Sequence, residues 1–293
     1  MKRFFLLLAI AVFFAQFASA QLFYKIEGNG LTKPSYIFGT HHAAPLSVLD
    51  RYNMGEYIDQ VDQIVGEVEM SAGMEGMQAQ MMKYVMAPED STLSKVLTAE
   101  EFGRVNEMLK KYYPMDLMMF DKMKPMMVTT MITLGSIQES LPSDDGEEGQ
   151  LDMYFQSMGK EKGKRVRGLE SVDFQAQLLY CKLSIREQAE GLLELLESGL
   201  DTPGGTAQKL NEAYLSEDLQ ALKALSDESE EAEADMMASF LDERNANWLE
   251  QLPGIMEEGP ALIAVGALHL VGDSGILEGL RSKGYTVSPV AGN

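Results

Sequence analysis

The strand-forming segments of this 293-residue chain are few and short, and they lie toward its two ends with long helical patterns between them. Apolar runs of this kind, bounded by Gly or Pro, are typical of strands that helices cover on both faces. A sheet built from them has to join residues from opposite ends of the chain. The segments are 36–38, 63–66, 165–167, 261–265 and 285–287.

Helical periodicity dominates the remaining sequence. The spacing predicts helices over 98–112, 116–138, 149–159, 171–181, 184–199, 205–225 and 230–252. We therefore predict an α/β fold, in which helices flank a mixed central β-sheet and a large helical insertion occupies about 70–160. No shift in composition marks a second domain, so residues 21–293 are expected to form one domain.

Residues 1–20 have the three parts of a secretory signal peptide. Lys2 and Arg3 are basic, residues 4–15 are apolar, and residues 18–20 form an Ala-Ser-Ala cleavage site. The apolar run is about half of the roughly 20 residues that a membrane-spanning helix needs. The alternative to a cleaved signal peptide is an uncleaved membrane anchor. No later segment is long enough to span, so we expect a periplasmic or secreted protein without a transmembrane segment after cleavage.

The composition excludes several kinds of partner and site. With 45 acidic and 24 basic side chains the net charge is −21, which argues against nucleic acid as a partner because phosphates require a basic face. The single Cys, Cys181, excludes a disulfide scaffold and any site built from several thiolates, and we expect it to be buried in a helix. With three His residues, a metal site has to combine imidazoles with carboxylates.

Two of the three His residues occupy matching positions. Residues 39–42 read Gly-Thr-His-His and residues 266–269 read Gly-Ala-Leu-His, and each segment directly follows a buried type of strand. Glycine permits a tight exit from the strand, which places His42 and His269 over its carboxyl end, where open α/β sheets bind ligands. A lone His is more often structural, but the repeated arrangement predicts a shared function for these two.

A third strand supplies an acid. Glu67 and Glu69 are two residues apart and so share one face of the strand, and Glu67, closer to the apolar run, is predicted to be the more buried. Burial of an acid costs free energy unless the acid is paired or metal-bound. The alternative is that Glu67 and Glu69 lie at a solvent-exposed strand end. Two His and one carboxylate suit a divalent cation with open positions, which favours hydrolysis of an amide or ester without a Ser or Cys nucleophile.

A polar helix precedes the second His segment. Arg244 and Trp248 are one turn apart there and share a face. An Arg in this position can stabilise a developing oxyanion or bind a substrate carboxylate. The alternative is an ordinary ion pair on a surface helix.

Methionine is concentrated in one part of the chain, with 14 of its 21 copies between Met70 and Met131. Their helical spacing predicts a core stripe, and the alternative is an adaptable groove, because the unbranched thioether can repack around different ligands. The spaced residues are Met70, Met74, Met77 and Met81, and again Met119, Met123 and Met127.

Several short motifs occur in one order over about 24–290. They are 39–42, the acidic strand 62–69, Lys124-Pro125, Leu151-Asp152, Gly163-Lys164, 168–170 with Gln175, 243–245, and 266–270 with Gly272 and Gly275. Through this ordered set the chain resembles the TraB/GumN family, which belongs with the Tiki metalloproteases and the haem-uptake ChaN-like proteins. The family often has Asp where Glu69 stands, and His41 occupies a variable position, so we treat it as a neighbour of the site.

The resemblance implies a divalent-metal hydrolase, with Mn²⁺ or Co²⁺ favoured and Zn²⁺ or Fe²⁺ as alternatives. His42, Glu67 and His269 would lie at the metal site, with Glu67 as a ligand or general base. Arg244 and Asn245 would bind the substrate carbonyl or stabilise the oxyanion.

We therefore expect an exported metal-dependent peptidase of the Tiki-like type. The first alternative is a non-catalytic binder of haem or a peptide that uses the same His pair and the Met-rich helices. The second is a metal-free esterase in which a His acts as base.

Overall fold

The computed structural model describes residues 21–292 with the exception of 71–72, 142–149, 200–203 and 228–230. The predicted signal peptide, residues 1–20, lies outside the described residues. Over the ranges that are described, none of the helices combines the length and apolar character needed to cross a membrane.

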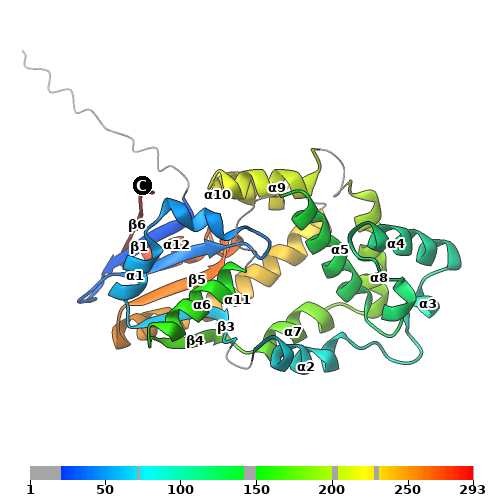
Figure 1. The fold of residues 1–293 in the computed structure, drawn as a ribbon, viewed down its shortest axis with the longest axis horizontal. Helices are drawn as coiled ribbons and strands as arrows, with labels where there is room; N and C mark the ends of the chain where they lie inside the picture. The colour runs from blue at the N-terminus through cyan, green and yellow to red at the C-terminus, as the bar shows by residue number, and fades with distance from the viewer. Residues whose placement is uncertain (1–20, 71–72, 142–149, 200–203, 228–230, 293) are drawn as a thin grey trace, which may run out of the picture.

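Six strands form one mixed sheet within the described residues, in the order β4-β3-β5-β2-β1-β6 (Figure 1). The neighbours β4, β3, β5 and β2 run parallel, whereas β1 is antiparallel to both β2 and β6. This arrangement confirms the predicted α/β fold with a mixed central sheet. The strands are β1 (Phe23–Gly28), β2 (Ser35–Thr40), β3 (Gln63–Val68), β4 (Arg165–Glu170), β5 (Ala261–Gly266) and β6 (Tyr285–Pro289).

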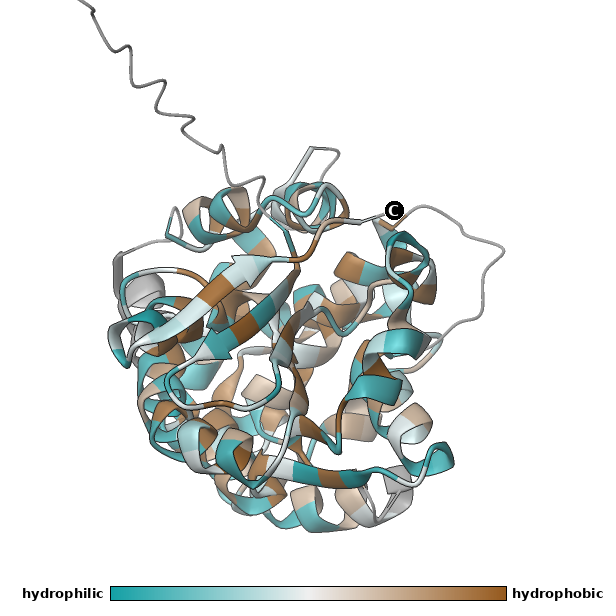
Figure 2. Cartoon of the chain, turned by 90° about the vertical axis from the view of Figure 1, so that its left-hand side faces the viewer, coloured by the Kyte–Doolittle hydropathy of each residue, from teal (hydrophilic) through white to brown (hydrophobic). Residues whose placement is uncertain are grey.

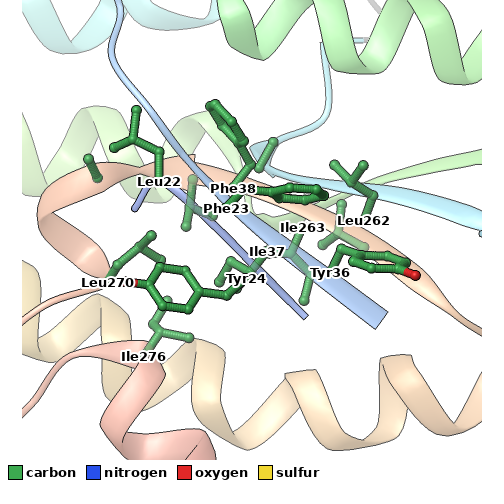
Figure 3. Packing of buried hydrophobic residues seen from close by; sticks show 14 of the residues in the cluster. Leu22, Phe23, Tyr24, Tyr36, Ile37, Phe38, Leu262, Ile263, Leu270 and Ile276 are labelled. Atoms are coloured by element: carbon green, nitrogen blue, oxygen red, sulfur yellow. The ribbon is translucent and has the colours of Figure 1, made fainter. Parts of the chain in front are cut away.

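Helices cover both faces of the sheet, which is why β2 and β3 are buried at every position. On one face Phe38 packs against Phe155 of α6 (Leu151–Glu161), with ring centroids 5.4 Å apart. On the other face Tyr24, Leu270 and Ile276 lie together (Figure 3). The apolar residues gather on the strands and on the inward sides of the helices, while the outer helix faces are hydrophilic (Figure 2).

The helices between and after the strands are mostly as expected. The α-helices are α1 (Met54–Gln60), α2 (Gly73–Val85), α3 (Leu93–Val96), α4 (Ala99–Tyr112), α5 (Pro125–Glu139), α6 (Leu151–Glu161), α7 (Val172–Cys181), α8 (Ile185–Glu197), α9 (Thr206–Leu215), α10 (Leu219–Asp227), α11 (Glu231–Glu258) and α12 (Ile276–Ser282). Three short 3₁₀ helices in the described residues are η1 (Leu46–Arg51), η2 (Leu117–Phe120) and η3 (Ala267–His269).

A second hydrophobic core lies apart from the sheet, among α3, α4, α5 and α8 (Figure 1). Leu109 of α4, Val128 of α5 and Leu192 of α8 are fully buried in it. Helix α6, by contrast, packs on the sheet, since Phe155 belongs to the main core. The stretch from β3 to β4 therefore contributes to both cores.

Three elements differ from the sequence-based expectation. Strand β1 was not predicted, because its apolar residues alternate with polar ones directly after the expected cleavage site. The helix expected over 116–138 is divided, since Pro125 occupies the first position of α5 and η2 forms separately. The helix expected over 205–225 is divided at Glu217, whose φ of +60° is incompatible with a continuing helix.

The environments of the sulfur-containing residues are mixed. Cys181 is exposed at the end of α7, so the expectation of a buried thiol is wrong. Met81 and Met127 pack into a small cluster with α7, as a core stripe requires. Met118 and Met119 are 58% and 69% exposed, so the methionine pattern is only partly a core stripe.

Candidate functional site

The predicted site residues come together at the carboxyl ends of three parallel strands. Thr40 pairs with Gly266 across β2 and β5, so the two Gly-x-x-His segments leave the sheet side by side. Glu67 lies near the end of β3, which flanks β5 on its other side. His42 and His269 therefore reach the same edge of the sheet as Glu67, where parallel sheets bind their ligands.

Asn245 fixes the tautomer of His269. The Asn245 amide nitrogen donates to the carbonyl oxygens of His269 and Ser274, at 3.3 and 3.1 Å, which leaves Oδ1 as the acceptor 2.7 Å from His269 Nδ1. Nδ1 therefore carries the proton, and Nε2 is the nitrogen with the lone pair. Nε2 accepts a hydrogen bond from Arg244 Nη1 at 2.8 Å. Burial lowers the pKa of His269 to about 3, so the ring is neutral at pH 7.

Arg244 is buried between two carboxylates. Its Nη2 donates to Glu67 Oε2 at 2.6 Å and to Glu170 Oε1 at 2.7 Å, while its Nε donates to both oxygens of Glu170 at 3.1 Å. Trp248 shares the same face of α11, as its spacing predicts, and its Nε1 also donates to Glu170. Arg244 is only 3% exposed, so it is not the surface ion pair that the sequence left open.

Glu67 is held as a carboxylate by several donors. Its Oε1 accepts a hydrogen bond from the backbone amide of Gly266 at 2.8 Å, and its Oε2 accepts one from Gln175 Nε2 at 3.1 Å in addition to the Arg244 contact. Burial alone would raise the pKa of Glu67, but Arg244 and the surrounding donors lower it to about 2. As predicted, the acid is buried and paired, with 9% of its surface exposed.

Asp152 orients His42 in a similar way. Asp152 Oδ2 lies 3.1 Å from His42 Nδ1, and its Oδ1 accepts a hydrogen bond from Thr40 Oγ1 at 2.9 Å. Because a carboxylate only accepts, His42 Nδ1 carries a proton and, in the neutral ring, Nε2 has the lone pair. The hydrogen bond with Asp152 raises the pKa of His42 to about 9, so this ring is protonated at pH 7 and has to lose its Nε2 proton before it can bind a cation. The His42 side chain is 61% exposed, whereas that of Asp152 is 7% exposed.

The donor atoms fit a divalent cation in their chemistry. His42 and His269 each have Nδ1 bound to an oxygen acceptor, which is how metal-binding imidazoles are oriented in proteins. Nε2 has the lone pair in His269, and in His42 it gains one once the ring loses its proton. Glu67 adds an ionised carboxylate. Over the described residues, no three His, Cys, Asp or Glu side chains are already arranged to hold a metal ion. Arg244 Nη1 donates a hydrogen bond to His269 Nε2, so this hydrogen bond has to break before that nitrogen can bind a metal ion.

A family model for the TraB/PrgY/gumN family matches residues 22–289, nearly the whole chain. The chain belongs to the TraB/PrgY/gumN family. This membership confirms the resemblance that the ordered motifs indicate. Neither the curated proteins nor the solved structures contain a match to the chain.

Two acidic residues of this TraB/PrgY/gumN family member received no role from the sequence. Glu170 anchors Arg244, and Asp152 orients His42. Both belong to motifs that carry the family resemblance, which was the available signal. Glu170 also ends a short strand, as Glu67 nearly does, so the argument about strand ends applied to it equally. The contact of Asp152 with His42 spans 110 residues, and no local pattern indicates it.

Proposed function

We propose that this protein is an exported metal-dependent hydrolase whose substrates are peptides. In this proposal His42, His269 and Glu67 hold a divalent cation, with Mn²⁺ or Co²⁺ favoured by the resemblance to the Tiki branch. The peptide substrate also comes from that resemblance.

One observation carries the metal proposal. Two imidazoles from opposite ends of the chain lie at neighbouring strand ends, and each has its Nδ1 bound to an oxygen. Imidazoles with only a packing role have no need of the same Nδ1-to-oxygen contact beside a buried carboxylate. The same orientation is what second-shell partners give to metal-binding His, by fixing the ring and its basicity.

The chain's own residues supply the rest of the chemistry. A divalent cation, when bound, lowers the pKa of water and polarises a carbonyl. Glu67 stays ionised because Arg244 lowers its pKa, so it can serve as a ligand or accept a proton. Arg244 is fixed by Glu170 beside Glu67 and His269. In this proposal its positive charge stabilises the negative charge that develops on the substrate oxygen. Asn245 keeps His269 in the tautomer that presents Nε2.

The experiment is metal loading and peptide hydrolysis by the wild-type protein and by His42→Ala and His269→Ala. We expect the wild type to bind Mn²⁺ or Co²⁺ stoichiometrically, to lose activity with a chelator and to regain it on reloading. Both variants should lose metal and activity, whereas the matched variant His41→Ala should retain the metal. The proposal would be refuted if the wild type cannot be loaded with metal and the His42→Ala and His269→Ala variants behave like the wild type.

Two other outcomes identify the alternatives. Hydrolysis that is insensitive to chelators but lost in the His variants would indicate a metal-free esterase. A Soret band on titration with haem, without hydrolysis, would indicate a haem-binding protein. Export is tested separately, since N-terminal sequencing of the secreted or periplasmic protein should find Gln21 as the first residue.

A further inference from the structure

His41 lies directly beside the proposed metal ligand His42 but is oriented by different partners. Its Nδ1 accepts a hydrogen bond from the backbone amide of Ala43 at 3.2 Å. Its carbonyl oxygen accepts from the amide of Ala44 at 3.1 Å, which closes the same short turn. On its other side the ring packs on Tyr214, with centroids 5.0 Å apart. The ring is thus fixed by the turn and by an aromatic neighbour.

The hydrogen bond from Ala43 determines where the proton of His41 lies. A ring nitrogen that accepts a hydrogen bond carries no proton, so the ring is neutral and Nε2 carries the N–H. Asp152 imposes the opposite arrangement on neutral His42, with the proton on Nδ1 and the lone pair on Nε2. The two adjacent rings are therefore held through Nδ1 in opposite ways: His42 donates from Nδ1 to Asp152, whereas His41 accepts at Nδ1 from Ala43.

No described residue accepts a hydrogen bond from the Nε2–H of His41. Within the described part of the chain, His41 Nε2 makes no hydrogen bond, whereas both nitrogens of the neighbouring site residue His269 are occupied. His41 is also close enough to His42 and Asp152 to interact with both electrostatically. Beside the proposed hydrolytic centre, an N–H that no described residue accepts suits an oxygen of the substrate.

We propose that His41 is a catalytic residue whose Nε2–H donates a hydrogen bond to the carbonyl oxygen of the peptide substrate. The proposal rests on the proposed function, because it assigns a second donor to the same site. Arg244 is charged and anchored by Glu170, whereas His41 is neutral and anchored by the turn. The two donors can then act on substrate oxygens from different elements of the fold, α11 and the segment after β2.

The tautomer is tested first, and without reference to activity. In the full mature protein labelled with ¹⁵N-histidine, long-range ¹H–¹⁵N spectra at pH 7 distinguish the two neutral tautomers. We expect His41, assigned through its loss in His41→Phe, to be the Nε2–H form. A His41 in the Nδ1–H form, or as an imidazolium, would overturn the proposal.

Kinetics then test the role. His41→Phe keeps an aromatic ring against Tyr214 but removes the N–H, and we expect kcat to fall by about 10²- to 10³-fold. His41→Gln, which keeps an N–H donor, should recover part of this loss. Both variants should bind one Mn²⁺ or Co²⁺ like the wild type, as monitored by titration of the apoprotein.

The outcomes separate this proposal from the proposed function. A wild type that hydrolyses peptides, with a His41→Phe variant of equal kcat, overturns the role of His41 alone. A His41→Phe variant that loses the metal makes His41 a ligand and also overturns it. A wild type without metal or hydrolysis overturns both proposals.

Discussion

Arg244 Nη2 lies 2.6 Å from Glu67 Oε2 and so joins the middle of the 28-residue helix α11 to the end of β3. Both side chains are almost fully buried, at 4% and 10% exposure. Since Glu170 binds the same guanidinium, one cation compensates two buried carboxylates. Loss of Arg244 would therefore leave two buried carboxylates without a counter-charge at this edge of the sheet.

Removal of Arg244 should destabilise the protein strongly. Arg244→Ala leaves Glu67 and Glu170 buried without a counter-charge, and the loss of one partner of a buried pair costs about 3–5 kcal/mol. Urea unfolding followed by circular dichroism measures the change. The exposed pair of Arg186 and Glu190 on α8 provides the control, and Arg186→Ala should leave the free energy of unfolding nearly unchanged, because solvent screens an exposed pair. Equal stabilities of the two variants would contradict the prediction.

Acid should destabilise the protein through His269 and Glu67. The pKa of His269 is about 3 in the folded protein against a usual 6.5, so its contribution to stability is complete above pH 6.5 and is lost as the pH falls toward 3. The pKa of Glu67 is about 2 against a usual 4.5, so its contribution is lost between pH 4.5 and 2. Both effects lower the free energy of unfolding as the pH falls.

Urea titrations of the apoprotein at a series of pH values measure this dependence. We expect His269→Gln to have a smaller slope between pH 6.5 and 4.5 than the wild type, because it lacks the titrating ring. The slope below pH 4.5 should remain, since Glu67 still titrates there. A wild-type stability that is constant from pH 6.5 to 4.5 would refute the assignment of a buried neutral His269.

Asp152 should control the metal affinity of His42. Asp152→Ala removes the acceptor that holds His42 Nδ1, and loss of such a partner typically lowers metal affinity by about 10- to 100-fold. Titration of the apoprotein with Mn²⁺ or Co²⁺ measures the dissociation constant. Asp173→Ala removes the same charge from an exposed pair with Lys83 and should leave it unchanged. If both variants bind alike, Asp152 has no orienting role.

The sequence was informative where chemistry and local pattern coincide. The two Gly-x-x-His segments and Glu67 follow buried strands, so the topology of a parallel sheet was enough to predict that they meet. Arg244 was placed on the correct helix face by its spacing from Trp248. What the sequence could not provide was the partner of each side chain, because the Asp152–His42 and Glu170–Arg244 pairs join residues 110 and 74 positions apart.

The local differences have similar causes. Pro125 begins α5 and Glu217 separates α9 from α10, so each divides a helix that periodicity alone predicts as continuous. Strand β1 alternates apolar and polar residues, and it is held in the sheet by antiparallel pairing with β2 on one side and β6 on the other. The proton positions on His41 and His42 depend on their contacts with Ala43 and Asp152. Two adjacent His residues therefore differ in whether Nδ1 carries a proton, and the sequence alone does not predict that difference.

Gly168 should tolerate no side chain, because β3 and β4 approach closely beside the site. A Cβ at Gly168 would lie 2.5 Å from the backbone nitrogen of Glu69 and 2.9 Å from Val68 backbone atoms, which cannot move without displacing the end of β3. Gly168→Ala is therefore expected to destabilise by about 1–3 kcal/mol, as overpacking does. Because Glu67 directly precedes Val68, the variant should also weaken metal binding.

Gly103, in the exposed part of α4, is the matched control for this substitution. A Cβ there meets no atom within 4 Å, so Gly103→Ala should stabilise the protein by up to about 1 kcal/mol through helix propensity. Thermal unfolding of both variants measures the two effects, which have opposite signs. A Gly168→Ala variant as stable as Gly103→Ala would mean that β3 and β4 can separate at this point without cost, and the position of Glu67 would then not depend on their close approach.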